Sequence, residues 1–321
     1  MSQYSLVGDI GGTNARFALV EGDSRQLLHV HTLQCADYEN VHQACEAYLA
    51  QVGVSSVSRA CLAFACPVDG DVVSMTNNHW HFEPASLKQF LNLDELKLLN
   101  DFTAQALGML EVSASDLMSL EKGRGQEKAN APKLVIGPGT GLGVSALVPA
   151  SGSWVPLATE GGHVSFAPTD DLEVQIWQFL NARFSRVSAE RLLCGQGLVN
   201  IYEALCHIHN RAPKPLSPAD ITGLAVSRED ELAYLALSRF CRLLGSVVGD
   251  AVLTLGAKGG VYLCGGILPR VKDFLLQSEF FAGMESKGRF KDYLGQVPVW
   301  LCTAEQPGLL GAAAGLSNPH V

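Results

Sequence analysis

The chain has 321 residues, of which 47 % are hydrophobic and 17 % charged, so it is long enough for two domains and too apolar for a disordered protein. Its 23 basic and 32 acidic residues give a net charge of −9, which disfavours a nucleic-acid partner or an anionic membrane surface. The nine cysteines form no C-x-x-C pair and no secretory signal is visible, so we expect reduced, buried thiols in a cytoplasmic protein.

The first half of the sequence alternates strands and helices. Hydrophobic patterning predicts strands at 4–7, 16–20, 27–33, 60–65 and 96–99, and helices at 41–50, 85–91 and 102–110. Glycines and prolines interrupt the uncharged stretch 134–158, so we expect strands and turns there and no membrane span.

The second half repeats this order. Strands are predicted at 133–136, 144–148, 154–158, 261–264 and 299–302, and helices around 172–180, 232–248 and 308–316. Two halves with three opening strands followed by β-α units predict a duplicated α/β fold. The polar stretch 113–131 is either the crossing between two lobes or a surface insertion.

Each half contains a glycine loop between two strands, at 8–14 (GDIGGTN) and 137–143 (GPGTGLG). Dinucleotide-binding and P-loop motifs lead into a helix instead, and neither spacing fits them. Backbone N–H groups in such loops can bind phosphates, and a carboxylate such as Asp9 beside them can hold Mg²⁺ through its water shell. Two tight β-hairpins without a ligand are the alternative interpretation.

Several polar side chains lie at strand ends. Asn100-Asp101 stands between a strand and a helix, so Asp101 can be a helix N-cap, a general base, or both, because the two roles do not exclude each other. Glu160 and His163, separated by two glycines, can face one small polar molecule, although His163 could instead be a buried core histidine. Glu190 stands early in a predicted helix after Ser188, where an acid in the first turn is favoured by the helix dipole. Gly265-Gly266 either admits a flat base or forms a plain β-α turn.

Seven motifs carry a resemblance to a known family. In chain order they are DIGGTNARFALV, LLNDFTAQAL, GPGTGLGV, EGGHVSFAP, SAERLLCGQGLVN, LCGGILPR and PGLLGAAAG. Together they cover essentially the whole chain and resemble the bacterial, proteobacterial-type glucokinase family of the hexokinase superfamily. The resemblance implies an α/β, two-lobed, duplicated ribonuclease H-like (actin-like ATPase) fold with an interdomain cleft. The small lobe would comprise residues 1–111 and 303–321, and the large lobe residues 112–302.

The resemblance also implies an enzyme, an ATP:hexose 6-phosphotransferase that converts D-glucose to glucose 6-phosphate in the first step of glycolysis. Asp101 would be the general base, and the sugar would be bound by Asn100, Asp101, Glu160, His163 and Glu190. The residues implied to bind ATP and Mg²⁺ are Gly8, Asp9, Ile10, Gly11, Gly12, Thr13, Gly137, Gly139, Thr140, Gly141, Gly265 and Gly266, with Asp9 holding Mg²⁺ through water.

Zinc is not expected. Three H-x-H pairs occur, His29/His31, His79/His81 and His207/His209, but no third ligand is placed near any of them. The related ROK family of sugar kinases carries a cysteine-rich zinc motif after its E-x-G-H, whereas here residues 165–168 (SFAP) follow and the next cysteine is Cys194. The resemblance further implies a homodimer.

Three classes of protein compete on these observations. The first is an ATP-dependent kinase for glucose or for another hexose. The second is a non-catalytic sugar- or nucleotide-binding relative such as a repressor, which would need a helix-turn-helix, whereas the first strand is expected almost at once. The third is a chaperone- or actin-like ATPase, which would not need the E-x-G-H residues. We favour the glucose kinase.

Overall fold

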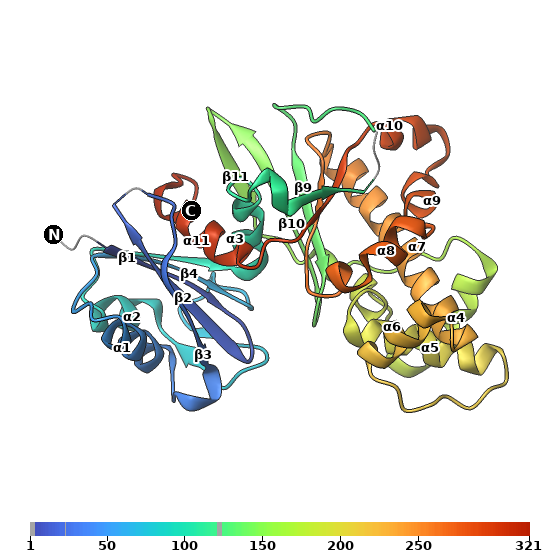
Figure 1. Cartoon of the computed structure of the whole chain (residues 1–321), viewed down its shortest axis with the longest axis horizontal. Helices are drawn as coiled ribbons and strands as arrows, with labels where there is room; N and C mark the ends of the chain where they lie inside the picture. The colour runs from blue at the N-terminus through green and yellow to red at the C-terminus, as the bar shows by residue number, and fades with distance from the viewer. Residues whose placement is uncertain (1–3, 23, 121–123) are drawn as a thin grey trace. The chain divides into compact units, whose positions relative to one another are not determined.

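The computed structural model describes residues 4–22, 24–120 and 124–321. The chain divides into two compact units (Figure 1). Unit 1 comprises the chain up to Asp116, then Ser145–Ala158 and Ala304–Val321, and unit 2 comprises Leu117–Val144 and Thr159–Thr303. The first division falls inside the polar stretch 113–131, of which residues 121–123 lie outside the described residues. Residues 145–158, expected from the sequence in the larger lobe, belong to unit 1.

Unit 1 is built on a five-stranded sheet of order β3-β2-β1-β4-β7. Its strands are β1 (Tyr4–Ile10), β2 (Asn14–Glu21), β3 (Leu28–Gln34), β4 (Arg59–Phe64) and β7 (Glu95–Asn100), with a short pair β5 (Val73–Ser74) and β6 (His81–Phe82) beside it. Its helices are α1 (Val41–Gln51), α2 (Pro84–Phe90), α3 (Asp101–Gly108) and α11 (Pro307–Ser317). In Figure 1, α1 and α2 cover one face of the sheet and α3 and α11 the other.

Unit 2 is built on a sheet of order β11-β10-β9-β12-β13-β8. The strands are β8 (Leu117–Ser119), β9 (Lys133–Pro138), β10 (Leu142–Ala150), β11 (Ser153–Leu157), β12 (Val261–Leu263) and β13 (Val299–Cys302); β10 continues into unit 1, to which β11 belongs. The helices are α4 (Asp171–Phe184), α5 (Gly195–Ile208), α6 (Pro218–Ser227), α7 (Glu231–Leu255), α8 (Lys272–Gln277), α9 (Phe280–Glu285) and α10 (Lys291–Gly295).

The two sheets share one pattern, which confirms the predicted duplicated α/β fold. In the first, β2 pairs antiparallel with β1 and β3, while β4 and β7 continue from β1 in parallel. In the second, β10 and β11 form an antiparallel pair, while β12 and β13 continue from β9 in parallel. The uncharged stretch 134–158 forms β9, β10 and β11, as expected.

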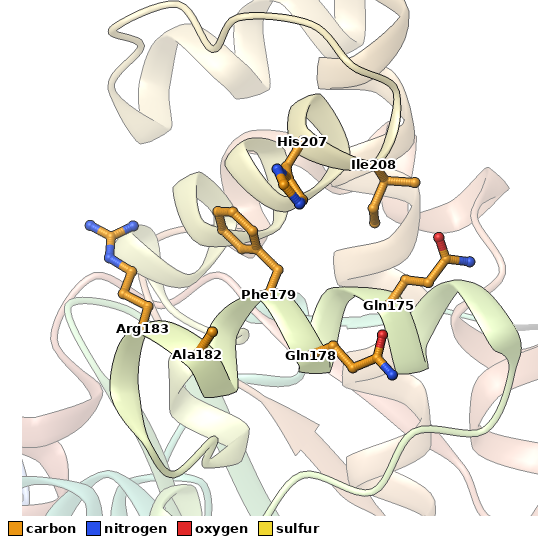
Figure 2. Close-up of a pocket in the computed structure, with 7 residues that line it drawn as sticks. All are labelled: Gln175, Gln178, Phe179, Ala182, Arg183, His207 and Ile208. Carbon is orange, nitrogen blue, oxygen red and sulfur yellow. The ribbon is translucent and has the colours of Figure 1, made fainter.

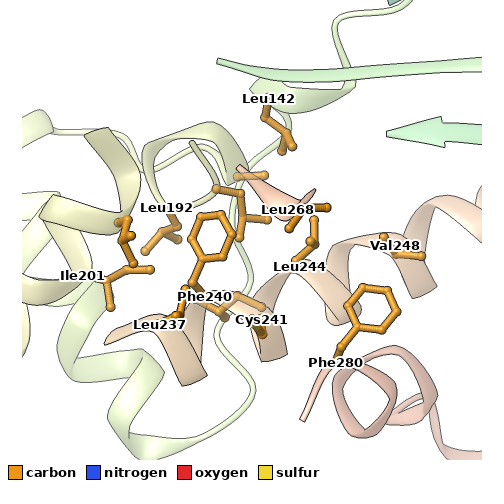
Figure 3. Packing of buried hydrophobic residues seen from close by; sticks show 14 of the residues in the cluster. Leu142, Leu192, Ile201, Leu237, Phe240, Cys241, Leu244, Val248, Leu268 and Phe280 are labelled. Carbon is orange, nitrogen blue, oxygen red and sulfur yellow. The ribbon is translucent and has the colours of Figure 1, made fainter. Parts of the chain in front are cut away.

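Each unit has its own hydrophobic core, and the two clusters of buried side chains share no residue. Figure 3 shows part of the cluster in unit 2, in which Phe240 and Leu244 of α7 pack with Leu192 and Leu142. Helix α7 is long and apolar enough to cross a membrane, but 61 % of its most apolar window is buried inside the protein, as in a core helix. All nine cysteines are free and buried, which agrees with the expected reduced thiols.

The predicted elements differ from the observed ones mainly at their ends. β1 runs through Ile10 and β9 through Pro138, so each glycine loop is three residues long instead of seven. The sequence did not indicate β8, which consists of three residues and pairs antiparallel with β13. Short strands of this kind are defined by a partner distant in the sequence, so local patterning does not reveal them.

Candidate functional site

The carboxyl ends of three parallel strands of unit 1 lie in one row. In the sheet register, Ile10 of β1 neighbours Phe64 of β4, which neighbours Asn100 of β7. Asp9 and Asp101 therefore lie near each other's level at the carboxyl ends of these strands. The carboxyl ends of parallel strands are where α/β sheets present the side chains that contact ligands.

The Asp9 carboxylate lies between a cation and a helix N-terminus. Its Oδ2 is 3.7 Å from Nη1 of Arg16. A Cβ added to Gly308, in the first turn of α11, would lie 2.7 Å from the Asp9 carboxyl carbon, so glycine allows this helix end to approach. Burial raises the pKa of Asp9, and Arg16 opposes that shift. Because 22 % of the side chain stays exposed, a hydrated Mg²⁺ fits this oxygen donor.

Loop one is a tight hairpin connection, Gly11 to Thr13. The Gly11 N–H donates to the Asn14 carbonyl oxygen at 2.9 Å. Gly8 and Ile10, implied to bind the nucleotide, lie within β1. A Cβ on Gly8 would lie 2.8 Å from the Leu62 side chain, so its glycine is explained by packing inside unit 1.

Asn100, and not Asp101, caps α3. The Asn100 Oδ1 accepts from the N–H groups of Phe102 and Thr103, at 2.9 and 3.3 Å. Asp101 is the first residue of the helix, and its Oδ1 accepts from the N–H of Phe102 at 2.8 Å. The interpretation of Asp101 as the N-cap is therefore wrong. An acid in the first turn still interacts favourably with the helix dipole.

In unit 2, loop two lies against two other segments. The Gly139 N–H donates to the Gly141 carbonyl oxygen at 2.8 Å, and the Gly139 carbonyl oxygen accepts from Gly195 N–H, at the start of α5, at 2.9 Å. Gly137 approaches the Gly265 turn so closely that a Cβ on Gly137 would lie 3.0 Å from the Gly265 nitrogen. The backbone thus brings loop two and the Gly265-Gly266 turn together.

Three polar side chains form a cluster next to loop two. His163 Nε2 is 3.9 Å from Glu160 Oε2, and His163 Nδ1 is 3.9 Å from Glu190 Oε1. The other oxygen of Glu190, Oε2, accepts from the N–H of Leu142 at 2.8 Å. The His163 side chain is 56 % exposed, so its interpretation as a buried core histidine is wrong.

The backbone that carries this cluster is held by close contacts. Gly161 and Gly162 lie in a short 3₁₀ helix, where a Cβ on either would overlap the start of β10. Glu190 lies in the first turn of a 3₁₀ helix, Ala189–Arg191, which confirms its predicted position early in a helix after Ser188. The Ser188 side chain accepts from Arg191 N–H and caps this turn.

Comparison with known proteins identifies the family. A family model described as Glucokinase matches residues 6–319. The chain belongs to the glucokinase family. It is 52 % identical to the Glucokinase of Hahella chejuensis over 320 residues, which is 100 % of this chain and 99 % of that protein. The crystal structure of a glucokinase from an Antarctic psychrotroph superposes with a TM-score of 0.89 at 37 % identity, covering 98 % of this chain and 99 % of that one.

A more distant neighbour shares the fold. It is a ROK family glucokinase from Streptomyces griseus in complex with glucose and AMPPNP, with a TM-score of 0.65 and 17 % identity, covering 98 % of this chain and 99 % of that one. The neighbours confirm the actin-like ATPase fold that the resemblance implies for this glucokinase-family chain.

Some residues that support the site in this glucokinase-family chain have no sequence motif that indicates them. The buried Asn200 donates from Nδ2 to the Arg191 carbonyl oxygen at 2.8 Å and so holds the turn that carries Glu190. Arg186 donates from Nη2 to the His163 carbonyl oxygen at 2.5 Å. These contacts join residues 9 and 23 positions apart, separations that belong to no known motif, so the sequence does not indicate them.

A groove between α4 and α5 of the glucokinase-family chain contains none of the predicted site residues (Figure 2). In it, the His207 ring lies 5.2 Å from the Phe179 ring, so this member of an H-x-H pair packs against an aromatic side chain. Among the described residues, no group of three or more His, Cys, Asp or Glu side chains is arranged to hold a metal ion.

Asn100 variants separate capping from ligand binding in this glucokinase-family chain. Asn100→Ala should lower the free energy of unfolding by about 1 kcal/mol, because the N-terminal N–H groups of α3 lose their acceptor. Asn100→Asp keeps an acceptor for these N–H groups and should lose less stability than Asn100→Ala, but it removes the amide donor and with it the bond to the Cys66 carbonyl oxygen at 3.5 Å. If the amide donates to the sugar, the glucose Kd rises in both variants. Urea denaturation and glucose titration check this; equal glucose affinity in all three proteins would leave Asn100 only its capping role.

Proposed function

We propose that this member of the glucokinase family transfers the γ-phosphoryl group of ATP to the 6-hydroxyl of D-glucose, with Asp101 as the general base. ATP-dependent phosphorylation of glucose follows from the family. The single observation that supports the residue assignment is the cluster in unit 2. There Glu190 accepts a hydrogen bond from Leu142 N–H, next to loop two, and its other carboxylate oxygen lies 3.9 Å from His163 Nδ1. A sugar-hydroxyl cluster bound to a phosphate-type loop suits a sugar kinase.

The residues of unit 1 supply the acid-base and charge chemistry of the proposal. Asp101 accepts the proton of the attacking hydroxyl, and Asn100 binds a sugar hydroxyl. The N–H groups of Gly12 and Thr13 bind phosphate oxygens of Mg-ATP, while the Gly11 N–H holds the hairpin through its bond to the Asn14 carbonyl oxygen. Asp9 holds the Mg²⁺ that arrives with ATP through the water shell of the ion, and the ion neutralises phosphate charge.

The residues of unit 2 recognise the remaining parts of the substrates. Glu160, His163 and Glu190 accept or donate hydrogen bonds to glucose hydroxyls, and a sugar that lacks one of these hydroxyls leaves a partner unpaired. Loop two, with Gly137, Gly139, Thr140 and Gly141, binds phosphate oxygens. Gly265-Gly266 admits the adenosine part against the backbone.

Release of ADP tests the function against the two other protein classes. We expect no ADP to form from Mg-ATP without a sugar. ADP should form fastest with glucose and more slowly with other hexoses. Omitting Mg²⁺ with a chelator should stop ADP formation without lowering the thermal midpoint. Sugar-independent ADP release would instead indicate an ATPase, and no release with any hexose would indicate a sugar-binding regulator.

We infer that the protein acts as a cytoplasmic homodimer in the first step of glycolysis, without zinc and without a nucleic-acid or membrane partner. The net charge of −9 supports the last point, because anionic polymers and surfaces are repelled. The lobe boundaries proposed from the sequence, 1–111 with 303–321 and 112–302, lie near those of the two compact units, apart from the β10–β11 segment.

A further inference from the structure

The carboxylate of Glu190 is shared between the sugar-ligand cluster and loop two. Its Oε1 lies 3.9 Å from Nδ1 of His163, and its Oε2 accepts from the N–H of Leu142 at 2.8 Å. Leu142 is the residue that directly follows the loop glycine Gly141. One rigid carboxylate plane therefore has one oxygen on the phosphate loop and the other toward the sugar-ligand histidine.

This arrangement requires that residue 141 has no side chain. A Cβ added to Gly141 would lie 2.5 Å from Glu190 Oε2 and 3.4 Å from its carboxyl carbon, and it would meet no other heavy atom within 4 Å. The backbone of Gly141 is not in the left-handed region, so its conformation does not need glycine. The Glu190 Oε2 thus occupies the space that a side chain at residue 141 would need.

The segments on either side of the contact are fixed by the core of unit 2. Leu142, which follows Gly141, and Leu192, which follows the turn of Glu190, belong to the same buried cluster (Figure 3). Asn200 holds the turn through its bond to the Arg191 carbonyl oxygen at 2.8 Å. A Cβ at residue 141 would therefore displace the end of the Glu190 side chain, which one hydrogen bond to Leu142 N–H holds, before it moved either backbone.

We propose that Gly141 is a positioning residue for glucose: it leaves the space in which Glu190 bonds to Leu142 N–H and so aims the other carboxylate oxygen at the sugar. This inference rests on the proposed role of Glu190 as a sugar ligand. A glycine of the phosphate loop then affects sugar affinity even when no nucleotide is bound. Because the hydrogen bond from Leu142 N–H to Glu190 joins loop two to the sugar ligand, binding at either place affects binding at the other.

The test is a titration of glucose, without nucleotide, into matched variants. Gly141→Ala should raise the glucose Kd about tenfold or more, because a charge-assisted contact is misaligned. Gly139→Ala is the matched control: its added Cβ would meet only the Gly141 carbonyl oxygen, at 4.0 Å, and the nucleotide-free glucose Kd should stay unchanged. Glu190→Ala should raise the Kd at least as much as Gly141→Ala.

A double-variant cycle distinguishes positioning from general damage to the loop. If Gly141 acts through Glu190, Gly141→Ala has no further effect in the Glu190→Ala background. It should still raise the Kd in the Glu190→Gln background, because the amide oxygen can accept from Leu142 N–H and occupies the same space. Equal effects of Gly141→Ala in the wild-type and Glu190→Ala backgrounds would overturn the inference.

A further measurement does not depend on the folding of Gly141→Ala. Glu190→Ala removes the acceptor of Leu142 N–H, so the Kd of Mg-ADP measured without glucose should rise several-fold, and an unchanged value would overturn the inference. The failure of the proposed function looks different. If Glu190→Ala leaves the glucose Kd unchanged, Glu190 is no sugar ligand; if Glu190→Ala raises it and Gly141→Ala does not, the sugar role stands and only the positioning role of Gly141 is lost.

Discussion

Asp101→Asn should lower kcat for glucose by about 10²- to 10⁴-fold, the range expected when a general base is removed. The glucose Kd and the thermal midpoint should stay close to those of the wild type. An asparagine keeps the acceptor that Phe102 N–H now finds on Asp101, and the cap of α3 belongs to Asn100, so the helix start is preserved. Only the capacity to take a proton is lost.

Asp171→Asn provides a matched control for this variant. Asp171 is likewise the first residue of a helix, α4, and another side chain, Asp170, caps that helix. The control loses the same charge next to a helix N-terminus but lies outside the proposed site. Steady-state kinetics with glucose and Mg-ATP check both. A kcat of Asp101→Asn within a few-fold of the control would show that Asp101 is not the base.

Gly311→Ala should lower the free energy of unfolding by about 3 kcal/mol, because it inserts a methyl group where two helices touch through their backbones. A Cβ on Gly311 of α11 would overlap the carbonyl oxygen of Ala104 in α3, and a Cβ on Gly108 of α3 would overlap that of Pro307. The two helices must separate to accept it. Urea denaturation followed by circular dichroism measures the loss.

The same variant should also lose activity beyond its loss of stability. Helix α3 begins at Asp101, and α11 begins at Pro307, next to the contact between Gly308 and the Asp9 carboxylate. Separating the helices therefore disturbs both proposed functional carboxylates of unit 1. Gly223→Ala in α6 is the control, since its added Cβ meets no atom within 4 Å and should stabilise by about 0.5–1 kcal/mol. Equal stability of Gly311→Ala and the wild type would contradict the tight packing.

Part of the fold is predictable from the sequence because some of its strands, such as β4 and β9, are buried on both faces. The apolar run 60–65 matches β4, and the run 133–136 begins β9, since a strand covered by helices or loops on each side needs few polar residues. Ends of elements are less predictable. β1 extends to Ile10 because it pairs in parallel with β4 up to Phe64, and no local signal encodes that partner.

The candidate site is predictable as a set of residue types, and its geometry is not. The E-x-G-H spacing placed Glu160 and His163 near each other in the prediction, and the structure has them 3.9 Å apart. That Glu190 lies 2.8 Å from the N–H of Leu142 could not be anticipated, because the two residues are 48 positions apart. Whether Asn100 or Asp101 caps α3 likewise depends on which of the two is the last residue with extended backbone before the helix. Both residue types are good N-caps, so the sequence does not decide between them.

We propose that this chain phosphorylates glucose on its 6-hydroxyl with ATP. The most direct measurement is ³¹P and ¹³C NMR of the product formed from glucose, ATP and Mg²⁺, with 6-deoxyglucose as a substrate that lacks the attacked hydroxyl. We expect one sugar phosphate, esterified at carbon 6 and formed in equal amount to ADP, and no product from 6-deoxyglucose. Phosphate on another carbon, or ADP formed without any sugar phosphate, would contradict it.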